Sequence, residues 1–291
     1  MVVVETTRGL FRLVEVYYAQ KREDVDALKN SLGLNKIVYI RHAPILLEIG
    51  RFAGWYRPTP TVLLDLGRDV GDLFREASST CRNLIRRIDR VSSQTAICLN
   101  DSAAYADFLK LYNGFVAHTR HTEPLSRSGL DRLRPIIDVF VAYFEGRPLC
   151  GHVFIRDQAT RRVRLLFSAS TRLEREDTPA FVGSINRWLH WYEIRLYKSE
   201  GMLVYDFGGA GTDTPREAGI ARFKQSFGGT QVLEHNYIAA GPIARIAIAL
   251  FYAVRRICSA KSAFGVGGLL TNSGWTNIRK ARVVEEHGRG P

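Results

Sequence analysis

The segment between residues 138 and 171 constrains the fold of this chain most. It contains three apolar runs of strand length, "DVFVAYFEG", "RPLCGHVFIRD" and "RRVRLLFSAST", with turn-like steps at Glu145-Gly146 and at residues 157–160. Connections this short join antiparallel neighbours, because a parallel pair needs a long crossover. The sequence therefore predicts an antiparallel three-stranded meander around which the other elements pack.

Apolar periodicity on both sides of this meander alternates between helix and strand. We expect strands at residues 61–66, 95–100, 202–209 and 230–239, and helices at residues 69–92, 102–119, 128–137, 179–201 and 219–229. Residues 69–92 form either one long helix or a pair. Both kinds of segment in mixed order are typical of an α+β fold, which is the predicted fold class.

The N-terminal residues predict a smaller, separate part. "GLFRLVEVYYA" and "KIVYIRHAPILLEI" have strand patterns, and "REDVDALKNSL" between them predicts a short helix. The Pro-rich "RPTPT" that follows predicts a boundary. The sequence therefore predicts a boundary near residues 57–61.

The chain is strongly basic. Its 291 residues carry a formal net charge of +12, and 46% of them are hydrophobic, which suffices for a sizeable core. Such a surplus favours polyanions: nucleic acid, nucleotide phosphates or anionic lipid. Arg82, Arg86 and Arg90 are spaced so that a helix places them on one face. That face is either a solvated surface with counterions or a ridge that binds phosphates.

The cysteines and the first residues indicate the compartment. No two of the four cysteines form a C-x-x-C pair, so the sequence predicts neither a zinc site nor a disulfide framework. The H-x-x-H of residues 118–121 is too short for the helical zinc motif, and no metal is expected. The first residues lack the pattern of a secretory signal. The expected location is cytoplasmic.

An apolar stretch near the C-terminus, "GPIARIAIALFYAVRRI", covers residues 241–257. Arg245 interrupts it and Arg255 with Arg256 ends it. It is shorter than the ~20 residues of a membrane-spanning helix. We expect a helix that docks on the protein, with peripheral contact to a membrane surface as the alternative.

The most unusual stretch is "YDFGGAGTDTPREAGIARFKQSFGGT", residues 205–230. It places Arg222, Phe223 and Lys224 between two pairs of glycines. Packing alone does not require a cation beside an aromatic ring there. A ligand site would use this arrangement, whereas the alternative is a core phenylalanine beside a solvated lysine.

Three stretches together resemble a known family. "GWYRPTPTVLLDLGRDVGDLFREASSTCRNLIRRIDR", "NRWLHWYEIRLYKSEGMLVYDFGG" and "GIARFKQSFGG" follow one another as in the Fem-type aminoacyl transferases. The resemblance implies a GNAT (acetyltransferase-like) fold, which that family often contains as two tandem units. Residues 66–240 would form a complete unit and residues 1–65 a truncated first one, which leaves residues 241–291 as a C-terminal helix and tail. The family's coiled-coil arm is not evident here.

The resemblance also implies a chemistry. Family members take an amino acid from its ester on tRNA and transfer it to an amine, which forms an amide without a cofactor or metal. The expected partners are charged tRNA and a small amine, peptide or nucleoside acceptor, because a truncated first unit suits a small acceptor. The basic composition suits a tRNA donor.

The same resemblance assigns roles within the motif. Lys224 would stabilise the oxyanion of the tetrahedral intermediate, and Phe223 would stack on the terminal adenine. Asp206 is the first candidate for a general base. Residues expected to contact substrate or tRNA are Arg82, Arg86, Arg90, Arg222, Tyr205, Gly208 and Gly209. Further base candidates are Asp65, His118, His121 and Glu123.

Two rival functions stay open. "REAGIA", residues 216–221, matches the R-x-x-G-x-A pyrophosphate loop of acetyl-CoA enzymes, but it falls one strand later than that loop should. A CoA- or acyl-carrier-dependent N-acyltransferase of the same fold is still the first alternative. The second is an inactive GNAT scaffold that binds RNA or an anionic membrane.

Overall fold

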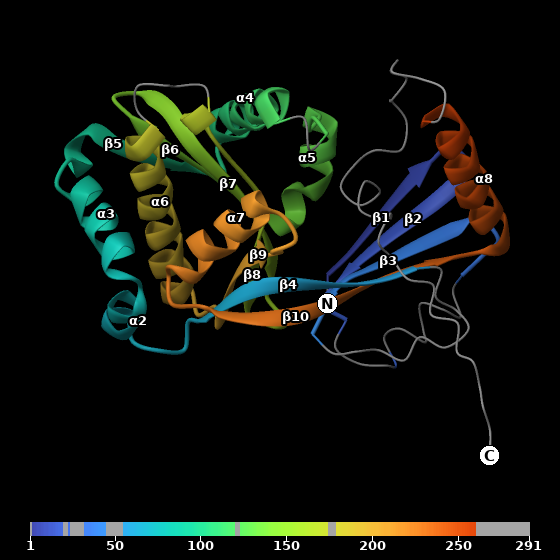
Figure 1. Ribbon diagram of the computed structural model, residues 1–291, viewed down its shortest axis with the longest axis horizontal. Coiled ribbons are helices and arrows are strands. Elements are labelled where there is room, and N and C mark those ends of the chain that lie inside the picture. Colours follow the sequence, from blue (N-terminus) through green and yellow to red (C-terminus); the bar gives the residue numbers. More distant parts are fainter. Residues whose placement is uncertain are drawn as a thin grey trace. The chain divides into compact units, whose positions relative to one another are not determined.

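The structure is a computed structural model that describes residues 2–19, 23, 32–44, 55–119, 123–173 and 179–259 (Figure 1). The chain forms two compact units. The terminal unit comprises Met1–Thr59 and Leu233–Pro291, and the central unit comprises Pro60–Val232. These boundaries precede the predicted ones at residues 65 and 240, and the C-terminal helix belongs with the N-terminal strands.

The central unit contains a mixed sheet with the strand order β4-β9-β8-β7-β6-β5. Its assigned neighbours are antiparallel, except for the parallel pair of β8 and β9. The predicted meander corresponds to β6, β7 and β8 and is confirmed. The bounds are β4 (Trp55–Asp65), β5 (Thr95–Leu99), β6 (Ile137–Phe144), β7 (Arg147–Asp157), β8 (Arg162–Ser170) and β9 (Val204–Gly209).

Helices cover both faces of this sheet (Figure 1). α2, α3 and α6 share one apolar cluster with it, and α4 and α5 share another. The bounds are α2 (Val70–Glu76), α3 (Ser79–Asp89), α4 (Ser102–Thr119), α5 (Arg127–Leu133), α6 (Pro179–Ser199) and α7 (Pro215–Gln225), with 3-10 turns at Ser92–Gln94, Arg134–Ile136 and Thr171–Leu173. The α+β class predicted from the sequence is confirmed.

Local signals in the sequence fix the ends of the helices near the motif. α6 stops before Gly201, whose φ of +78° suits glycine. α7 starts after Thr214, whose side chain accepts a hydrogen bond from the Glu217 amide, and Pro215 occupies the first helical turn. Ser78 caps α3 in the same way, through the Cys81 amide.

The parallel pair separates after a short contact. β8 and β9 pair from Arg162↔Val204 to Arg164↔Asp206. Beyond that point β8 continues alongside β7 as far as Ser170, whereas β9 continues alongside β4 as far as Gly209. The two strands thus part in the middle of the sheet, where their pairing ends at Asp206.

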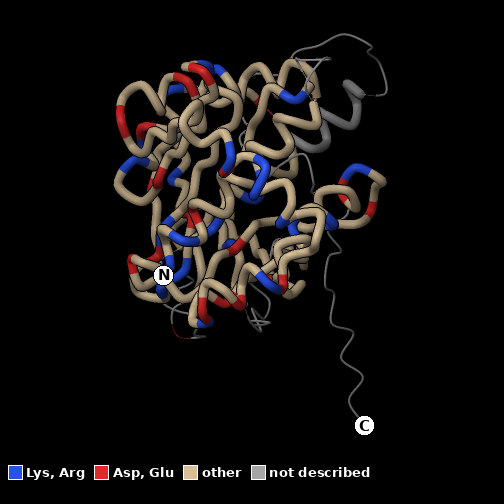
Figure 2. The backbone as a smooth tube through the Cα atoms, turned by 90° about the vertical axis from the view of Figure 1, so that its left-hand side faces the viewer, with Lys and Arg blue, Asp and Glu red and all other residues tan. Residues whose placement is uncertain are grey.

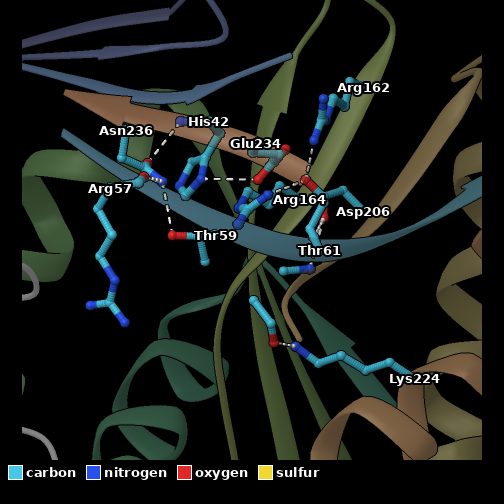
Figure 3. Close-up of polar contacts among 12 residues, drawn as sticks. His42, Arg57, Thr59, Thr61, Arg162, Arg164, Asp206, Lys224, Glu234 and Asn236 are labelled. Atoms are coloured by element: carbon cyan, nitrogen blue, oxygen red, sulfur yellow. Dashed lines mark hydrogen bonds and ion pairs between the residues drawn. The ribbon is translucent and has the colours of Figure 1, made fainter. Parts of the chain in front are cut away.

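The terminal unit contains strands in the order β1-β2-β3-β10. β1 and β2 form a hairpin, β3 is parallel to β2, and β10 is antiparallel to β3. Asn236 of β10 donates to the Arg57 carbonyl and to the Thr59 hydroxyl, which holds the start of β4 in this unit (Figure 3). The bounds are β1 (Val2–Arg8), β2 (Phe11–Tyr17), β3 (Lys36–Ala43), β10 (Thr230–Ala240) and α8 (Pro242–Ser259).

α8 is the expected C-terminal helix, and it docks on the terminal sheet. Ala244 and Ile248 are buried in one cluster with Ile37 and Tyr39 of β3. No helix within the described residues is long and apolar enough to cross a membrane. The helix predicted for "REDVDALKNSL" falls outside the described residues, apart from Glu23 and Leu32.

Candidate functional site

Lys224 lies in the last turn of α7 and is buried, with 9% of its surface exposed. Its Nζ donates a hydrogen bond of 2.7 Å to the Gly209 carbonyl (Figure 3). An ammonium group has three N–H donors, so two remain available among the described contacts. Burial lowers the pKa of Lys224 to about 7; the charge of Arg164 acts in the same direction, and that of Asp206 opposes it.

This ammonium group lies where β8 and β9 part. A Cβ atom built on Gly208 would be 3.8 Å from Lys224 Nζ and 2.7 Å from the Leu165 carbonyl oxygen of β8. The lysine therefore lies beside a close approach of the two strands, two residues beyond the last paired residue of β9. A reacting carbonyl placed beside this ammonium group would meet a cation in a partly desolvated setting, where charge stabilisation is strong.

The structure argues against Asp206 as the general base. Its buried carboxylate accepts hydrogen bonds from the Thr61 hydroxyl at 2.5 Å and the Gly208 amide at 2.8 Å (Figure 3). It also pairs with the guanidinium groups of Arg162 and Arg164. Burial alone would raise the pKa of Asp206, but these two arginines hold it far below its ordinary range. The carboxylate is a structural anchor for β9.

The other candidates for the general base have no assigned contact with Lys224. Asp65 accepts from the Gly67 amide, where it shapes the turn after β4. His118 Nδ1 lies 2.9 Å from the Gly114 carbonyl in the same helix. Glu123 is exposed, and His121 falls outside the described residues. None of these contacts connects the described candidates to α7.

Tyr205 is not positioned to touch a substrate, contrary to the prediction. It is fully buried, its hydroxyl donates to Glu193 Oε2 at 2.8 Å, and His190 Nδ1 lies 2.7 Å from that hydroxyl. His152 bonds Glu193 Oε1 at 2.7 Å and Asn186 Oδ1 at 2.8 Å. This network ties α6 to β7 and β9 through the core.

The same network contains a group of described residues whose side chains could hold a metal ion. The ligand atoms of His152, His190 and Glu193 lie within 4.8 Å of one another. The two imidazole rings stack at 4.1 Å between centroids, and each donates or accepts within the network. Burial lowers the pKa of His190 to about 4, with the charge of His152 acting in the same direction. Hydrogen bonding explains this cluster, and an ion is not needed to hold it together.

The glycines of the motif approach the protein's own backbone, whereas the sequence predicted approach to a ligand. Gly208 has a φ of +72° and lies against Leu165 of β8. A Cβ atom on Gly229 would lie 2.9 Å from the Leu63 carbonyl oxygen of β4. Gly228 has a φ of +87°, which an L side chain rarely adopts. These glycines seat α7 and β9 in the sheet and thereby place Lys224.

Phe223 packs beside an arginine that the sequence analysis missed. The ring is half-buried, and its centroid lies 5.6 Å from those of His190 and Phe227. The guanidinium carbon of Arg187, on α6, lies 4.6 Å from the Phe223 centroid. The sequence signal was the position of Arg187 in the apolar run "INRWLHW".

Arg187 is a cation without a carboxylate partner among the described residues. Its Nη1 donates to the Gly183 carbonyl at 3.2 Å, and its buried Nε has no hydrogen-bond partner there. Burial lowers the pKa of Arg187; the nearby Cys81 opposes this effect, and the positive charge of Arg172 adds to it. The positive charges of Arg187 and Arg172, together with the unpaired Nε donor, favour the binding of an anion nearby.

The predicted arginine ridge is only partly available. Arg82 donates to the carbonyls of Arg75 and Ala77, so it closes the end of α2 instead of presenting its charge outward. The Arg86 guanidinium lies 5.2 Å from the centre of the Phe74 ring, and Arg90 is exposed. Figure 2 marks the basic and acidic positions on the side of the molecule that carries α2 and α3.

Further basic residues lie on α3 and α7. Arg87 of α3 lies over Phe181 of α6 at 5.9 Å, and Arg222 of α7 is exposed. In the described part of the chain, no carboxylate pairs with Arg86, Arg87, Arg90 or Arg222. Unpaired arginines on adjoining helices leave charge available for phosphate groups.

The R-x-x-G-x-A match does not form a loop. Residues 216–221 lie inside α7, which begins after the N-cap residue Thr214. The Ala218 amide already donates to the Thr214 carbonyl. A pyrophosphate loop presents free amides before a helix begins, so this stretch lacks that geometry.

No protein-family model and no curated protein sequence match this chain. Solved structures are similar to it. FemX has a TM-score of 0.57 at 11% identity, covering 86% of this chain and 85% of that one. L-PGS from Bacillus licheniformis has a TM-score of 0.51 at 14% identity, covering 87% and 84%.

A third similar structure is the C-terminal domain of a putative lysylphosphatidylglycerol synthetase from Agrobacterium fabrum. Its TM-score is 0.50 at 11% identity, with 87% of this chain and 84% of that chain covered. These similarities show that the fold is α+β and GNAT-like, as the resemblance to the Fem-type transferases implied.

Proposed function

We propose that this protein transfers an aminoacyl group from aminoacyl-tRNA to an amine acceptor and forms an amide, without a cofactor. The observation that carries this proposal is the buried Lys224 ammonium group, held by the Gly209 carbonyl where β8 and β9 part. The shared fold with FemX supports it. A small amine, peptide or nucleoside remains the proposed acceptor, and the cytoplasm the proposed location.

In the proposed reaction, the acceptor nitrogen attacks the ester carbonyl of the charged tRNA. The C–N bond forms, the C–O bond to the terminal ribose breaks, and the amine proton ends on the ribose oxygen. Lys224 donates to the oxyanion of the intermediate through its remaining N–H groups; one such donor is worth about 3 kcal/mol. Because the Asp206 carboxylate is already occupied by hydrogen bonds and ion pairs, the neighbouring ribose hydroxyl relays the amine proton to the leaving ribose oxygen.

The donor end of the tRNA would meet Phe223 and Arg187 together. Arg187 covers one side of the Phe223 ring, so the terminal adenine stacks on the guanidinium plane and a phosphate of the tRNA end pairs with the charge of this guanidinium group. The arginines of α3 then continue the contact along the RNA backbone. This modifies the sequence-based expectation, in which the adenine stacks directly on Phe223.

The decisive experiment offers the protein charged tRNA with a panel of amines, peptides, nucleosides and phosphatidylglycerol, and detects the products by mass spectrometry. Lys224→Met should reduce turnover by about 10²–10³-fold. Lys198→Met is the matched control, because Lys198 Nζ also donates to a backbone carbonyl, that of Leu66, at 2.8 Å. It should turn over like the wild type.

Other outcomes identify the rivals. Product formation from acetyl-CoA or an acyl carrier protein, and none from charged tRNA, would establish the N-acyltransferase. RNA binding without a product from any donor would indicate an inactive scaffold. Equal activity of the Lys224→Met variant and the wild type would refute the assigned role of the lysine.

Arg187→Ala tests the donor site separately. It should raise KM for charged tRNA by about tenfold or more and flatten its salt dependence, with a smaller effect on kcat. Arg75→Ala is the control, because Arg75 is an exposed arginine that pairs with Asp72 on α2. Unchanged KM in the Arg187 variant would contradict the stacking arrangement.

A further inference from the structure

One end of the terminal sheet exposes a group of large apolar side chains. The register pairs Arg8↔Phe11, Arg12↔Lys36 and Ile37↔Ala240 bring the β1–β2 turn, the start of β3 and the end of β10 to the same end. The exposed residues there, here called the α8 patch, are Leu10 (83% exposed), Leu34 (62%), Ile243, Ile246 (62%) and Leu250 (60%).

The members of the α8 patch are held next to one another. The Asn35 side chain donates to the Leu10 carbonyl, and the Leu34 carbonyl accepts from the Ile243 amide at 3.0 Å. Ile243, Ile246 and Leu250 follow the i, i+3, i+7 spacing of one helical stripe. Two loop leucines therefore continue the apolar stripe of the helix.

α8 is consequently apolar on two opposite sides. Ala244 and Ile248 face the terminal sheet, whereas Ile246 and Leu250 face away from it. A helix on the surface of a water-soluble protein normally has a polar outer face. The apolar outer face of α8 is instead typical of a surface that contacts a partner or a membrane. The segment Pro242–Ser259 also contains three arginines and no acidic residue.

We propose that the α8 patch inserts into the surface of an anionic phospholipid membrane. Apolar side chains on a short basic helix are the composition of interfacial helices, which lie in the headgroup region without spanning it. A positively charged chain is attracted to anionic lipid, whereas a second copy of a chain with a net charge of +12 is repelled. This surface is independent of the proposed aminoacyl transfer.

The test measures co-sedimentation of the full chain with vesicles of phosphatidylglycerol and phosphatidylcholine, and with vesicles of phosphatidylcholine alone. The wild type should bind the anionic vesicles, and added salt should weaken the binding. The double variant Ile246→Glu/Leu250→Glu should lower the partition coefficient by about tenfold or more for each side chain lost from the membrane.

Two further variants make the result specific. Leu10→Glu/Leu34→Glu should weaken binding without altering α8. Leu233→Glu should bind like the wild type, because Leu233 is similarly exposed (53%) on β10 but lies outside the patch. Circular dichroism checks that each variant is folded.

Three outcomes would overturn the proposal. The wild type fails to bind anionic vesicles, or the patch variants bind as well as the control. Alternatively, light scattering shows a dimer that only the patch variants lose, which would make the patch a self-association surface. Deleting residues 260–291 separates one more case: binding that appears only after the deletion would mean that this segment covers the patch.

Discussion

Replacing Lys224 by methionine should change how folding stability depends on pH, independently of any activity. Burial lowers the pKa of Lys224 from 10.5 to about 7. Between these values the unfolded chain carries a proton on this lysine that the folded chain lacks. Lowering the pH from 10.5 towards 7 therefore favours the unfolded state, and the free energy of unfolding of the wild type rises with pH across this window.

The magnitude follows from the same two values. One pKa unit corresponds to about 1.36 kcal/mol, so the wild type should gain about 3 kcal/mol relative to the methionine variant between pH 7 and pH 10. Below pH 7 the lysine is protonated in both states, and the difference levels off. The variant also loses the hydrogen bond to the Gly209 carbonyl, a pH-independent cost of about 1 kcal/mol.

Urea unfolding of both proteins at a series of pH values measures this difference directly. Lys198→Met again serves as the control for the loss of a lysine that donates to a backbone carbonyl. Parallel pH profiles for the wild type and Lys224→Met would show that residue 224 keeps an ordinary pKa. The reasoning about a desolvated ammonium group would then be wrong, whatever the enzyme does.

Three further substitutions probe the structure around this lysine. Asp206→Asn should lower the free energy of unfolding by about 3–5 kcal/mol at neutral pH, because two buried arginines lose their counterion. Since the pKa of Asp206 is depressed in the folded wild type, the difference between the wild type and the variant should shrink in thermal melts as the pH falls below 3.8. Gly229→Ala should cost about 1–3 kcal/mol in urea unfolding through the clash with the β4 backbone, and an unchanged midpoint would contradict the close approach. Tyr205→Phe should cost about 1–3 kcal/mol, seen as a lower Tm, because Glu193 loses a buried donor.

The sequence predicted the parts of the fold that depend on local patterns. The meander follows from short turns between apolar runs, and the end of α6 follows from Gly201. Lys224 was singled out because a cation between glycine pairs has no packing reason, and the structure buries it in α7 with its Nζ on the Gly209 carbonyl. Whether it acts in catalysis remains a prediction.

Tertiary contacts decided what the sequence analysis missed. The sequence named Asp206 as a candidate base because its two partners, Arg162 and Arg164, lie on another strand and their pairing with it is not visible in the sequence. Their i, i+2 spacing shows only that they share one face of β8. Tyr205 and His190 meet only because α6 packs across β9. Arg187 reaches Phe223 from a different helix, and no spacing within the sequence joins them.

The terminal unit is discontinuous in the chain, since its β3 pairs with β10 through contacts such as Ile37↔Ala240. The central unit is by contrast contiguous and acts as an insertion within its neighbour. During synthesis on the ribosome, residues 60–232 emerge complete while β3 still lacks this partner. We expect the nascent chain to fold from the middle outward, and β10 must leave the ribosome before the strands made first can close their sheet.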